Sequence, residues 1–171
     1  GSVFGPIPKV MWEEKVTADR KNRIKMGLNC LLLQNDSTNI LIDTGVGTKE
    51  PLKFKEFYGL SSGRLVRQLK AEGLAPKDIS AVILSHLHFD HAGGATRFDR
   101  SGSPVPTFPK AKYYVQNAAW DDAMNPNERA RAGYHNDDLY PLKDSGQLEI
   151  ITGDTEIFPG VSVQLTDGHT R

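Results

Sequence analysis

The sequence predicts an α/β layered domain. Segments with the residue pattern of strands alternate with segments of helical spacing, in the order strands, helix, strand, loop, helix, strands. Residues 79–84 form a nearly continuous apolar run of strand length, which is typical of a strand covered on both faces. We find no internal repeat, low-complexity tract or linker-like block, so residues 1–171 are interpreted as one domain. A chain of 171 residues is long enough to bury the hydrophobic core of one domain.

Turn and stop signals give the order of the elements. Two early strands flank the turn Asn35-Asp36-Ser37, which is a hairpin signal. The first helix begins at serine, ends before Gly73 and carries apolar residues at helical spacing. Residues 1–27 show neither the alternating apolar pattern of a strand nor the apolar spacing of a helix, and they are expected to form an extended lead-in. The expected strands are residues 28–34, 39–43, 79–84, 112–115, 148–151, 155–158 and 161–166, and the expected helices are residues 61–72 and 117–124.

Charge and composition exclude several classes of partner. The chain has 21 Lys and Arg residues against 21 Asp and Glu residues, so its formal net charge is zero. Proteins that bind nucleic acid or an anionic membrane surface usually carry a basic surplus. The longest apolar runs, such as residues 30–33 and 81–84, are far shorter than the roughly 18 residues that a membrane-spanning helix needs. We therefore expect a small-molecule substrate, uncharged or weakly charged, with no nucleic acid and no membrane as partners.

The single cysteine and the N-terminus indicate the compartment. Cys30 has no second cysteine with which to form an internal disulfide, and the N-terminus lacks a signal-peptide pattern. Both features favour a cytoplasmic protein. Cys30 lies in an expected strand and is interpreted as a buried structural thiol.

The residues that can carry chemistry gather directly after the apolar strand. The segment SHLHFDHAGG, residues 85–94, holds three of the five histidines of the chain. On an extended segment, residues two apart point the same way, so His86 and His88 can offer imidazole nitrogens to one cation. Asp90 and His91, turned by the bend that follows, can reach a second cation. Imidazole and carboxylate groups suit transition metals, so the pattern favours a metal site over a loop of solvated histidines.

A third nitrogen for the first cation can come from His169. This histidine follows the last expected strand, where a loop could return it to the cluster, and it would complete the three protein ligands of a zinc ion with an open water position. His135 lacks a comparable context and is interpreted as a solvated loop residue. The carboxylate pairs at residues 121–122 and 137–138 are interpreted as surface acids.

The H-x-H-x-D-H motif of residues 86–91, followed by the G-H-T of residues 168–170, resembles the metallo-β-lactamase superfamily of metal hydrolases. Asp43, at the end of an expected strand, matches the aspartate that this family usually places near the metals as a structural residue. The segment FGPIPKVMW, residues 4–12, is similar to the branch that contains quorum-quenching N-acyl-homoserine lactonases of the YtnP type and the related organophosphate hydrolases.

The resemblance implies an αβ/βα sandwich, of which residues 1–171 are the N-terminal part only. It also implies a dinuclear site, expected to hold zinc, although other divalent metals could replace it. Its first ion would be bound by His86, His88 and His169, and its second by Asp90 and His91, with Asp90 as the catalytic residue. Diiron flavoproteins of the superfamily use glutamate in place of His88, so this histidine favours hydrolysis, with a metal-bound hydroxide as nucleophile.

The expected function is metal-dependent hydrolysis of a lactone or related ester, as in N-acyl-homoserine lactonases. A glyoxalase II-like thioesterase and an organophosphate hydrolase are the alternative enzymes, and a metal-binding fragment without catalysis is the alternative of another class. In this superfamily a bridging aspartate and a last histidine lie beyond the position that matches Arg171. We expect a polypeptide ending there to hold at most one metal well, with little activity, unless a complementing C-terminal segment or a homodimer partner completes the site.

Overall fold

A computed structural model describes residues 2–61 and 63–170. The chain divides into two compact units. The N-terminal unit comprises Gly1–Gly27 and Pro51–Ser61, and the sheet unit comprises Leu28–Glu50 and Ser62–Arg171. The single-domain interpretation of residues 1–171 stays a prediction.

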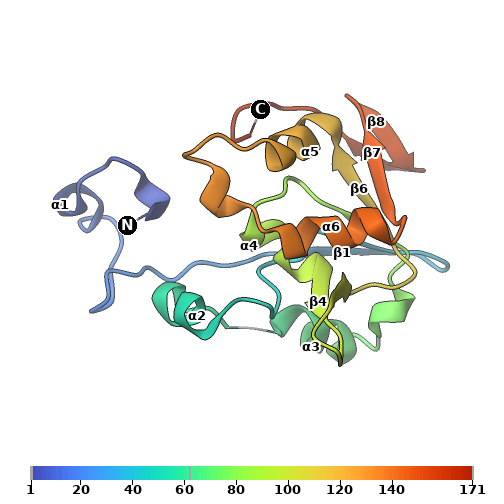
Figure 1. Cartoon of the computed structure of the whole chain (residues 1–171), viewed down its shortest axis with the longest axis horizontal. Helices are drawn as coiled ribbons and strands as arrows, with labels where there is room; N and C mark the ends of the chain where they lie inside the picture. Colours follow the sequence, from blue (N-terminus) through green and yellow to red (C-terminus); the bar gives the residue numbers. More distant parts are fainter. Residues whose placement is uncertain (1, 62, 171) are drawn as a thin grey trace. The chain divides into compact units, whose positions relative to one another are not determined.

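The sheet unit is built on one five-stranded mixed sheet (Figure 1). Its strand order is β1-β2-β3-β6-β7, with β1 and β2 antiparallel and the other neighbours parallel. The predicted hairpin is confirmed, because β1 pairs with β2 antiparallel. In its turn the side-chain oxygen of Asn35 accepts the backbone N–H groups of Ser37 (3.0 Å) and Thr38 (2.8 Å). The strands are β1 Leu31–Gln34, β2 Asn39–Ile42, β3 Ala81–Ile83, β6 Lys112–Gln116 and β7 Leu148–Ile151.

The remaining elements of the sheet unit are short. The helix expected at residues 117–124 is confirmed as α5, and the two strands expected near the end of the chain form a separate hairpin. A hairpin of β4 and β5 and the helix α6 were not predicted. The elements are α3 Arg64–Ala71, η2 Pro76–Asp78, α4 Phe89–Ala92, η3 Gly93–Ala95, β4 Thr96–Phe98, β5 Pro104–Pro106, α5 Asn117–Met124, η4 Arg131–Gly133, α6 Asn136–Asp144, β8 Thr155–Phe158 and β9 Val161–Val163.

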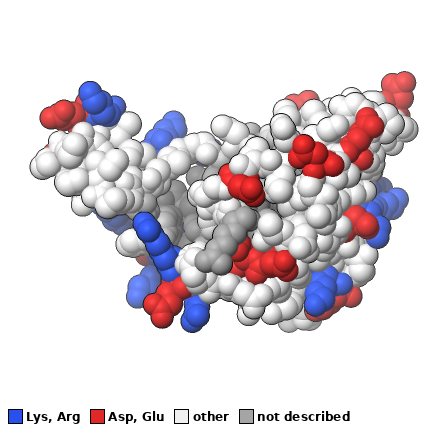
Figure 2. Space-filling model, turned by 90° about the horizontal axis from the view of Figure 1, so that it is seen from above, with Lys and Arg blue, Asp and Glu red and all other residues white. Residues whose placement is uncertain are grey.

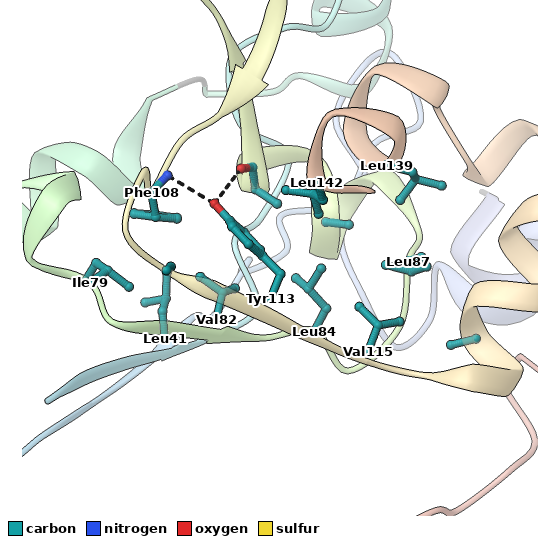
Figure 3. Close-up of a cluster of buried hydrophobic side chains, with 14 of the residues drawn as sticks. Leu41, Ile79, Val82, Leu84, Leu87, Phe108, Tyr113, Val115, Leu139 and Leu142 are labelled. Atoms are coloured by element: carbon teal, nitrogen blue, oxygen red, sulfur yellow. Dashed lines mark hydrogen bonds between the residues drawn. The ribbon is translucent and has the colours of Figure 1, made fainter. Parts of the chain in front are cut away.

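The central strand β3 is covered on both faces, as its apolar run predicts. Val82 packs into the larger core, which also contains Tyr113 and residues of α3, α5 and α6 (Figure 3). Ala81 and Ile83 point to the opposite face, where side chains of β8 and β9 pack against them. The two faces of one strand therefore serve two hydrophobic layers, which is the arrangement of a sheet between covering elements.

A tyrosine hydroxyl is satisfied inside the larger core. Tyr113 is fully buried, and its hydroxyl donates to Ala95 O (3.0 Å) and accepts from Phe108 N (3.1 Å), as Figure 3 shows. Burial of a phenol without such partners would cost free energy. These bonds fix the end of η3 and the segment after β5 to strand β6.

The first helix of the sheet unit begins later than the sequence predicts. α3 starts at Arg64, and the residue before it, Gly63, has φ 71°, a left-handed conformation that favours glycine. Serine was expected to start this helix at residue 61; Ser61 lies outside it, and residue 62 lies outside the described residues.

Residues 1–27, expected as an extended lead-in, contain the two short helices η1 and α1, and they share the N-terminal unit with α2. The bounds of these helices are η1 Ser2–Phe4, α1 Lys9–Trp12 and α2 Leu52–Tyr58. Trp12 is buried, and its ring stacks on Phe4 with centroids 5.0 Å apart. Arg23 pairs with Asp19 (2.7 Å) and donates to Glu56 O (2.9 Å). The stacked pair of Phe4 and Trp12 and the contacts of Arg23 thus stabilise a segment that has no regular apolar period.

Helix α6 contains a proline, and the carbonyl that this proline leaves without a helical donor bonds to strand β4. Pro141 has no N–H to donate to the carbonyl of Asp137, four residues earlier in the helix. That carbonyl instead accepts the side-chain hydroxyl of Thr96 (2.7 Å), which is 1% exposed. The missing helical hydrogen bond is therefore replaced by one between two elements.

Replacing Thr96 by valine is expected to destabilise the sheet unit by about 1–3 kcal/mol, because the shape is kept while the Asp137 carbonyl loses the buried Thr96 hydroxyl as its partner. Urea unfolding followed by circular dichroism measures this change. The exposed Thr152 supplies the control, since Thr152→Val should leave the unfolding midpoint almost unchanged. Equal midpoints for the two variants would contradict this account.

The distribution of basic side chains and the length of the helices bear on possible nucleic-acid and membrane partners. Among the described residues on the face drawn in Figure 2, Lys and Arg side chains lie singly or in small groups and form no extended basic surface. No helix within residues 2–61 and 63–170 has the length and hydropathy needed to cross a bilayer.

Candidate metal centre

The histidine-rich segment lies where the central strand β3 ends. Leu84 continues the strand pairing by donating its N–H to Tyr114 O (3.0 Å), and the chain then leaves the carboxyl edge of the sheet. Leu87 is 1% exposed in the core, and the backbone at His88 is extended (φ −63°, ψ 149°). Since neighbours alternate on extended backbone, Leu87 anchors the segment while His86 and His88 face away from the core.

Three imidazoles converge at this edge of the sheet. Nε2 of His86 lies 3.1 Å from Nδ1 of His88, and the same Nδ1 lies 3.2 Å from Nε2 of His169. The three nitrogens lie within 4.8 Å of one another. His86 and His88 are partly buried, whereas His169 is exposed and reaches the cluster from the loop after β9. Three nitrogens at these separations could hold one metal ion.

A second group of polar side chains lies beside the three imidazoles. Oδ2 of Asp43 lies 2.7 Å from Nδ1 of His91, and Ser85 donates to Asp43 through its N–H (2.8 Å) and its hydroxyl (2.9 Å). The other ring nitrogen of His91, Nε2, lies 3.8 Å from Oδ2 of Asp90. Asp43 therefore orients His91 so that its second nitrogen lies near Asp90. The rings of His86 and His91 have centroids 4.1 Å apart, so the two groups adjoin.

The protonation preferences of the site follow from burial and hydrogen bonding. Burial and the neighbouring histidines lower the pKa of His86 to about 3, and burial and His169 lower the pKa of His88. The hydrogen bond to Asp43 raises the pKa of His91. Burial alone would raise the pKa of Asp43, but the hydrogen bonds from His91 and Ser85 outweigh it and lower this pKa. The first two imidazoles thus favour the neutral form that metals require.

The backbone at Asp43 is held in an unusual conformation. Its φ of 58° lies in the left-handed region, which aspartate tolerates better than most residues. The N–H of Asp43 donates to Ile83 O (2.9 Å), so the end of β2 is tied to the end of β3. This turn aims the Asp43 carboxylate at the segment that follows β3.

Glycines allow the loop after β2 to press against the histidine-rich segment. Thr44 donates its N–H and its hydroxyl to His91 O, both at 2.8 Å, and Gly94 donates its N–H to Gly45 O (2.8 Å). A Cβ at Gly94 would collide with Thr44 O, and one at Gly47 would lie 2.5 Å from Gly93 O. Any side chain at these two positions would therefore push the loops apart.

Residues of the segment before α6 pack against the ring of His88. The ring of Tyr134 lies against the ring of His88 with centroids 4.8 Å apart. A Cβ at Gly133 would lie 2.7 Å from Cδ2 of His88. Gly133 therefore leaves room for the His88 ring in its observed position.

The interpretation of His135 and Asp138 as surface residues is wrong. Asp138 is 1% exposed, and its Oδ1 pairs with Nζ of Lys49 at 2.8 Å. His135 is partly buried, and its Nδ1 lies 3.0 Å from Oε1 of the buried Glu50. The cause is tertiary packing, since α6 places residues 135 and 138 beside the loop after β2. Of the other predicted surface acids, Asp121 and Asp137 are exposed and Asp122 is partly exposed.

Sequence reasoning missed Lys49 and Glu50 altogether. Lys49 donates to Gly93 O (2.5 Å) and Thr96 O (2.9 Å) in addition to its ion pair with Asp138. No local pattern marks these contacts, because each joins segments that are distant in the sequence. A buried lysine after a glycine-rich loop is visible only in three dimensions.

Cys30 is half-buried rather than fully buried. It packs against the larger core, and burial together with the charge of Asp43 raises the pKa of its thiol to about 11. The thiol therefore stays protonated near neutral pH and is a poor nucleophile.

Comparison with known proteins gives the family context of this site. Residues 25–170 match the family model described as the metallo-beta-lactamase superfamily. An N-acyl homoserine lactonase from Bacillus cereus is 31% identical over 160 residues, which cover 87% of this chain and 57% of that protein. The chain thus spans about half the length of the curated relatives it matches.

Solved structures give the same picture of the fold. A probable metal-dependent hydrolase from Staphylococcus aureus superposes with a TM-score of 0.82 at 30% identity, covering 97% of this chain and 58% of that one. An N-acyl homoserine lactone hydrolase, solved with the product N-hexanoyl-L-homoserine at its catalytic metal centre, has a TM-score of 0.61 at 30% identity, covering 82% and 54%. The predicted α/β fold is confirmed as the metallo-β-lactamase type.

Proposed function

The chain belongs to the metallo-β-lactamase superfamily, and we propose that it carries most of the metal ligands of a hydrolase that opens the ring of an N-acyl homoserine lactone. The observation that carries this proposal is the convergence of three imidazole nitrogens within 4.8 Å at the carboxyl edge of a mixed sheet. Loops at such edges are where open α/β sheets place their active sites.

The first proposed ion is held by His86, His88 and His169. The donor set fits a zinc ion, because neutral imidazole nitrogens are good zinc ligands and three of them leave one position open, as in catalytic zinc sites. Burial lowers the pKa of the first two, which favours their neutral form without metal. The separations of 3.1 and 3.2 Å between their nitrogens are close to the roughly 3.3 Å edge of a tetrahedron with ~2.0 Å bonds.

The second proposed ion is held by Asp90 and His91. The bond between Asp43 and Nδ1 of His91 leaves Nε2 for a metal, and ligating histidines typically use such a carboxylate partner on their other nitrogen. Asp43 is therefore proposed as a positioning residue rather than a ligand. Ser85 supports it with two hydrogen bonds.

Two bound divalent ions would supply a hydroxide nucleophile near neutral pH and would polarise the carbonyl oxygen of the substrate. The residues of the chain do the rest. Asp90, the proposed catalytic residue, would hold the second ion together with His91, while Asp43 and Ser85 keep the ring of His91 from turning. Tyr134 lies beside His88 and closes one side of the site.

The proposed substrate class is supported by the relatives and by charge. The relative from Bacillus cereus is named as an N-acyl homoserine lactonase, and the formal net charge of this chain is zero, which suits a weakly charged small molecule. The test is a panel of N-acyl homoserine lactones, thioesters and phosphotriesters with zinc-loaded protein. Turnover of lactones supports the proposal. Turnover of thioesters or phosphotriesters, with lactones untouched, would replace it with one of the alternative hydrolases.

Gly133 gives a prediction about the first ion that is independent of substrate. Gly133→Ala places a methyl group where the ring of His88 now lies, so this ring must move. We expect zinc affinity to fall by roughly 10–100-fold, the range seen when support of a metal ligand is lost. Competition with a chromophoric chelator measures it. The exposed neighbour Ala132 supplies the control, and an affinity loss no larger than that of Ala132→Ser would contradict the proposed role of His88.

A further inference from the structure

Behind the histidine-rich segment lies a second group of charged side chains, buried between the loop after β2 and the start of α6. Lys49, Glu50 and Asp138 are each less than a tenth exposed at their side chains, and His135 is partly buried beside them. The ring of His135 stacks on Phe89, with centroids 5.4 Å apart and an interplanar angle of 14°. Phe89 follows His88 directly, so this group adjoins the candidate metal centre without sharing a ligand with it.

One oxygen of this group has no partner. Oδ2 of Asp138 is buried and makes no hydrogen bond within the described part of the chain. Lys49 cannot supply one, because its three ammonium protons already serve Oδ1 of Asp138, Gly93 O and Thr96 O. The nearest ring nitrogen, Nδ1 of His135, lies 3.8 Å away, beyond hydrogen-bond distance.

The group is also short of positive charge. Two buried carboxyl groups, those of Glu50 and Asp138, lie beside one buried lysine, Lys49, and buried charges need partners. Burial raises the pKa of Asp138 even though Lys49 opposes the shift. A further cation beside Oδ2 would balance the charge of the group and would give this oxygen a partner.

We propose that Glu50, His135 and Asp138 form a binding site for a divalent cation, separate from the histidine centre. Their ligand atoms lie within 4.8 Å of one another, with Oε1 of Glu50 3.0 Å and Oδ2 of Asp138 3.8 Å from Nδ1 of His135. A point equidistant from three atoms so spaced lies about 2.0–2.4 Å from each, the range of zinc and calcium bonds to such ligands. The nitrogen ligand favours a transition metal such as Zn²⁺.

Such an ion would join three segments that are distant in the sequence. Glu50 follows the loop that presses against Gly93 and Gly94, His135 stacks on the residue between His88 and Asp90, and Asp138 belongs to α6. An ion at this site would stabilise the histidine-rich segment through the stack of His135 on Phe89. A proton on Asp138, which the raised pKa of this buried carboxyl favours, is the competing explanation, and the experiment distinguishes the two.

The experiment measures bound zinc in protein that is stripped with a chelator, reloaded with Zn²⁺ and desalted. Two conservative variants remove ligands, His135→Gln at the partly exposed position and Asp138→Asn at the buried one. The matched control is Asp137→Asn, which changes the neighbouring exposed carboxylate. We expect each ligand variant to lose one zinc equivalent relative to Asp137→Asn. His88→Ala should retain this equivalent, so failure of the proposed histidine centre would be seen separately.

Folding is checked by circular dichroism, and His135→Gln keeps the test decisive if Asp138→Asn does not fold. Cobalt loading gives a second readout, because Co²⁺ bound by His135 should lose part of its visible absorption in His135→Gln but not in Asp137→Asn. Unchanged zinc content and cobalt spectra in folded His135→Gln would overturn the proposal.

Discussion

Replacing His88 by alanine is expected to abolish zinc binding at the three-imidazole cluster and, under the proposed function, to reduce lactone hydrolysis by more than 100-fold. Loss of an outer hydrogen-bond partner alone costs roughly 10–100-fold in metal affinity or activity, and His88 is a proposed direct ligand. Its Nδ1 lies 3.1 Å and 3.2 Å from the other two ligand nitrogens, so its removal leaves only two of the three imidazoles. Zinc analysis and initial rates on the same preparation measure both effects.

The control for His88→Ala is Arg131→Ala, an exposed change in the η4 segment near the site. It should leave zinc content and rate unchanged. If folded His88→Ala keeps the full zinc content of the parent protein, the proposed ligand set is wrong. If zinc is lost while the lactonase rate persists, the ligand set stands and the proposed mechanism fails.

Of the variants described, Lys49→Met is expected to lower the free energy of unfolding most, by about 3–5 kcal/mol. It leaves the carboxylate of Asp138 buried without its ion-pair partner. The variant also removes the donors to Gly93 O and Thr96 O, which attach the histidine-rich segment to the loop after β2. Urea unfolding gives the free energy of unfolding. Lys110→Met, at an exposed lysine, should change this free energy by less than about 0.5 kcal/mol.

A double variant separates the ion pair from simple packing. In Lys49→Met with Asp138→Leu, no charge of the pair remains, and replacing both partners by apolar groups can be nearly neutral. We therefore expect the double variant to recover much of the stability that Lys49→Met loses. Additive losses in the double variant would show that the pair contributes through packing alone.

The elements with local signals could be predicted from the sequence. The apolar run at residues 79–84 predicts a strand buried on both faces, and β3 is that strand. The turn at Asn35 predicts the hairpin, because its side chain bonds the next two backbone amides. His86 and His88 could be placed on one side of the chain from their spacing alone, since Leu87 between them is apolar.

The elements held by tertiary contacts could not be predicted. Helix α6 contains Pro141, which argues against a helix until Thr96 is seen to satisfy the carbonyl that proline leaves without a donor. Lys49 and Asp138 are ordinary surface residue types in the sequence, and only packing makes them a buried pair. The extended lead-in was wrong at Trp12 because a buried aromatic stack leaves no periodic signal.

The central claim is that His86, His88 and His169 bind one metal ion together. The most direct measurement is anomalous X-ray diffraction at the zinc edge from crystals of the zinc-loaded protein. We expect a strong peak about 2.0–2.1 Å from one ring nitrogen of each of the three histidines. Zinc-loaded crystals with no anomalous peak among these three rings would contradict it.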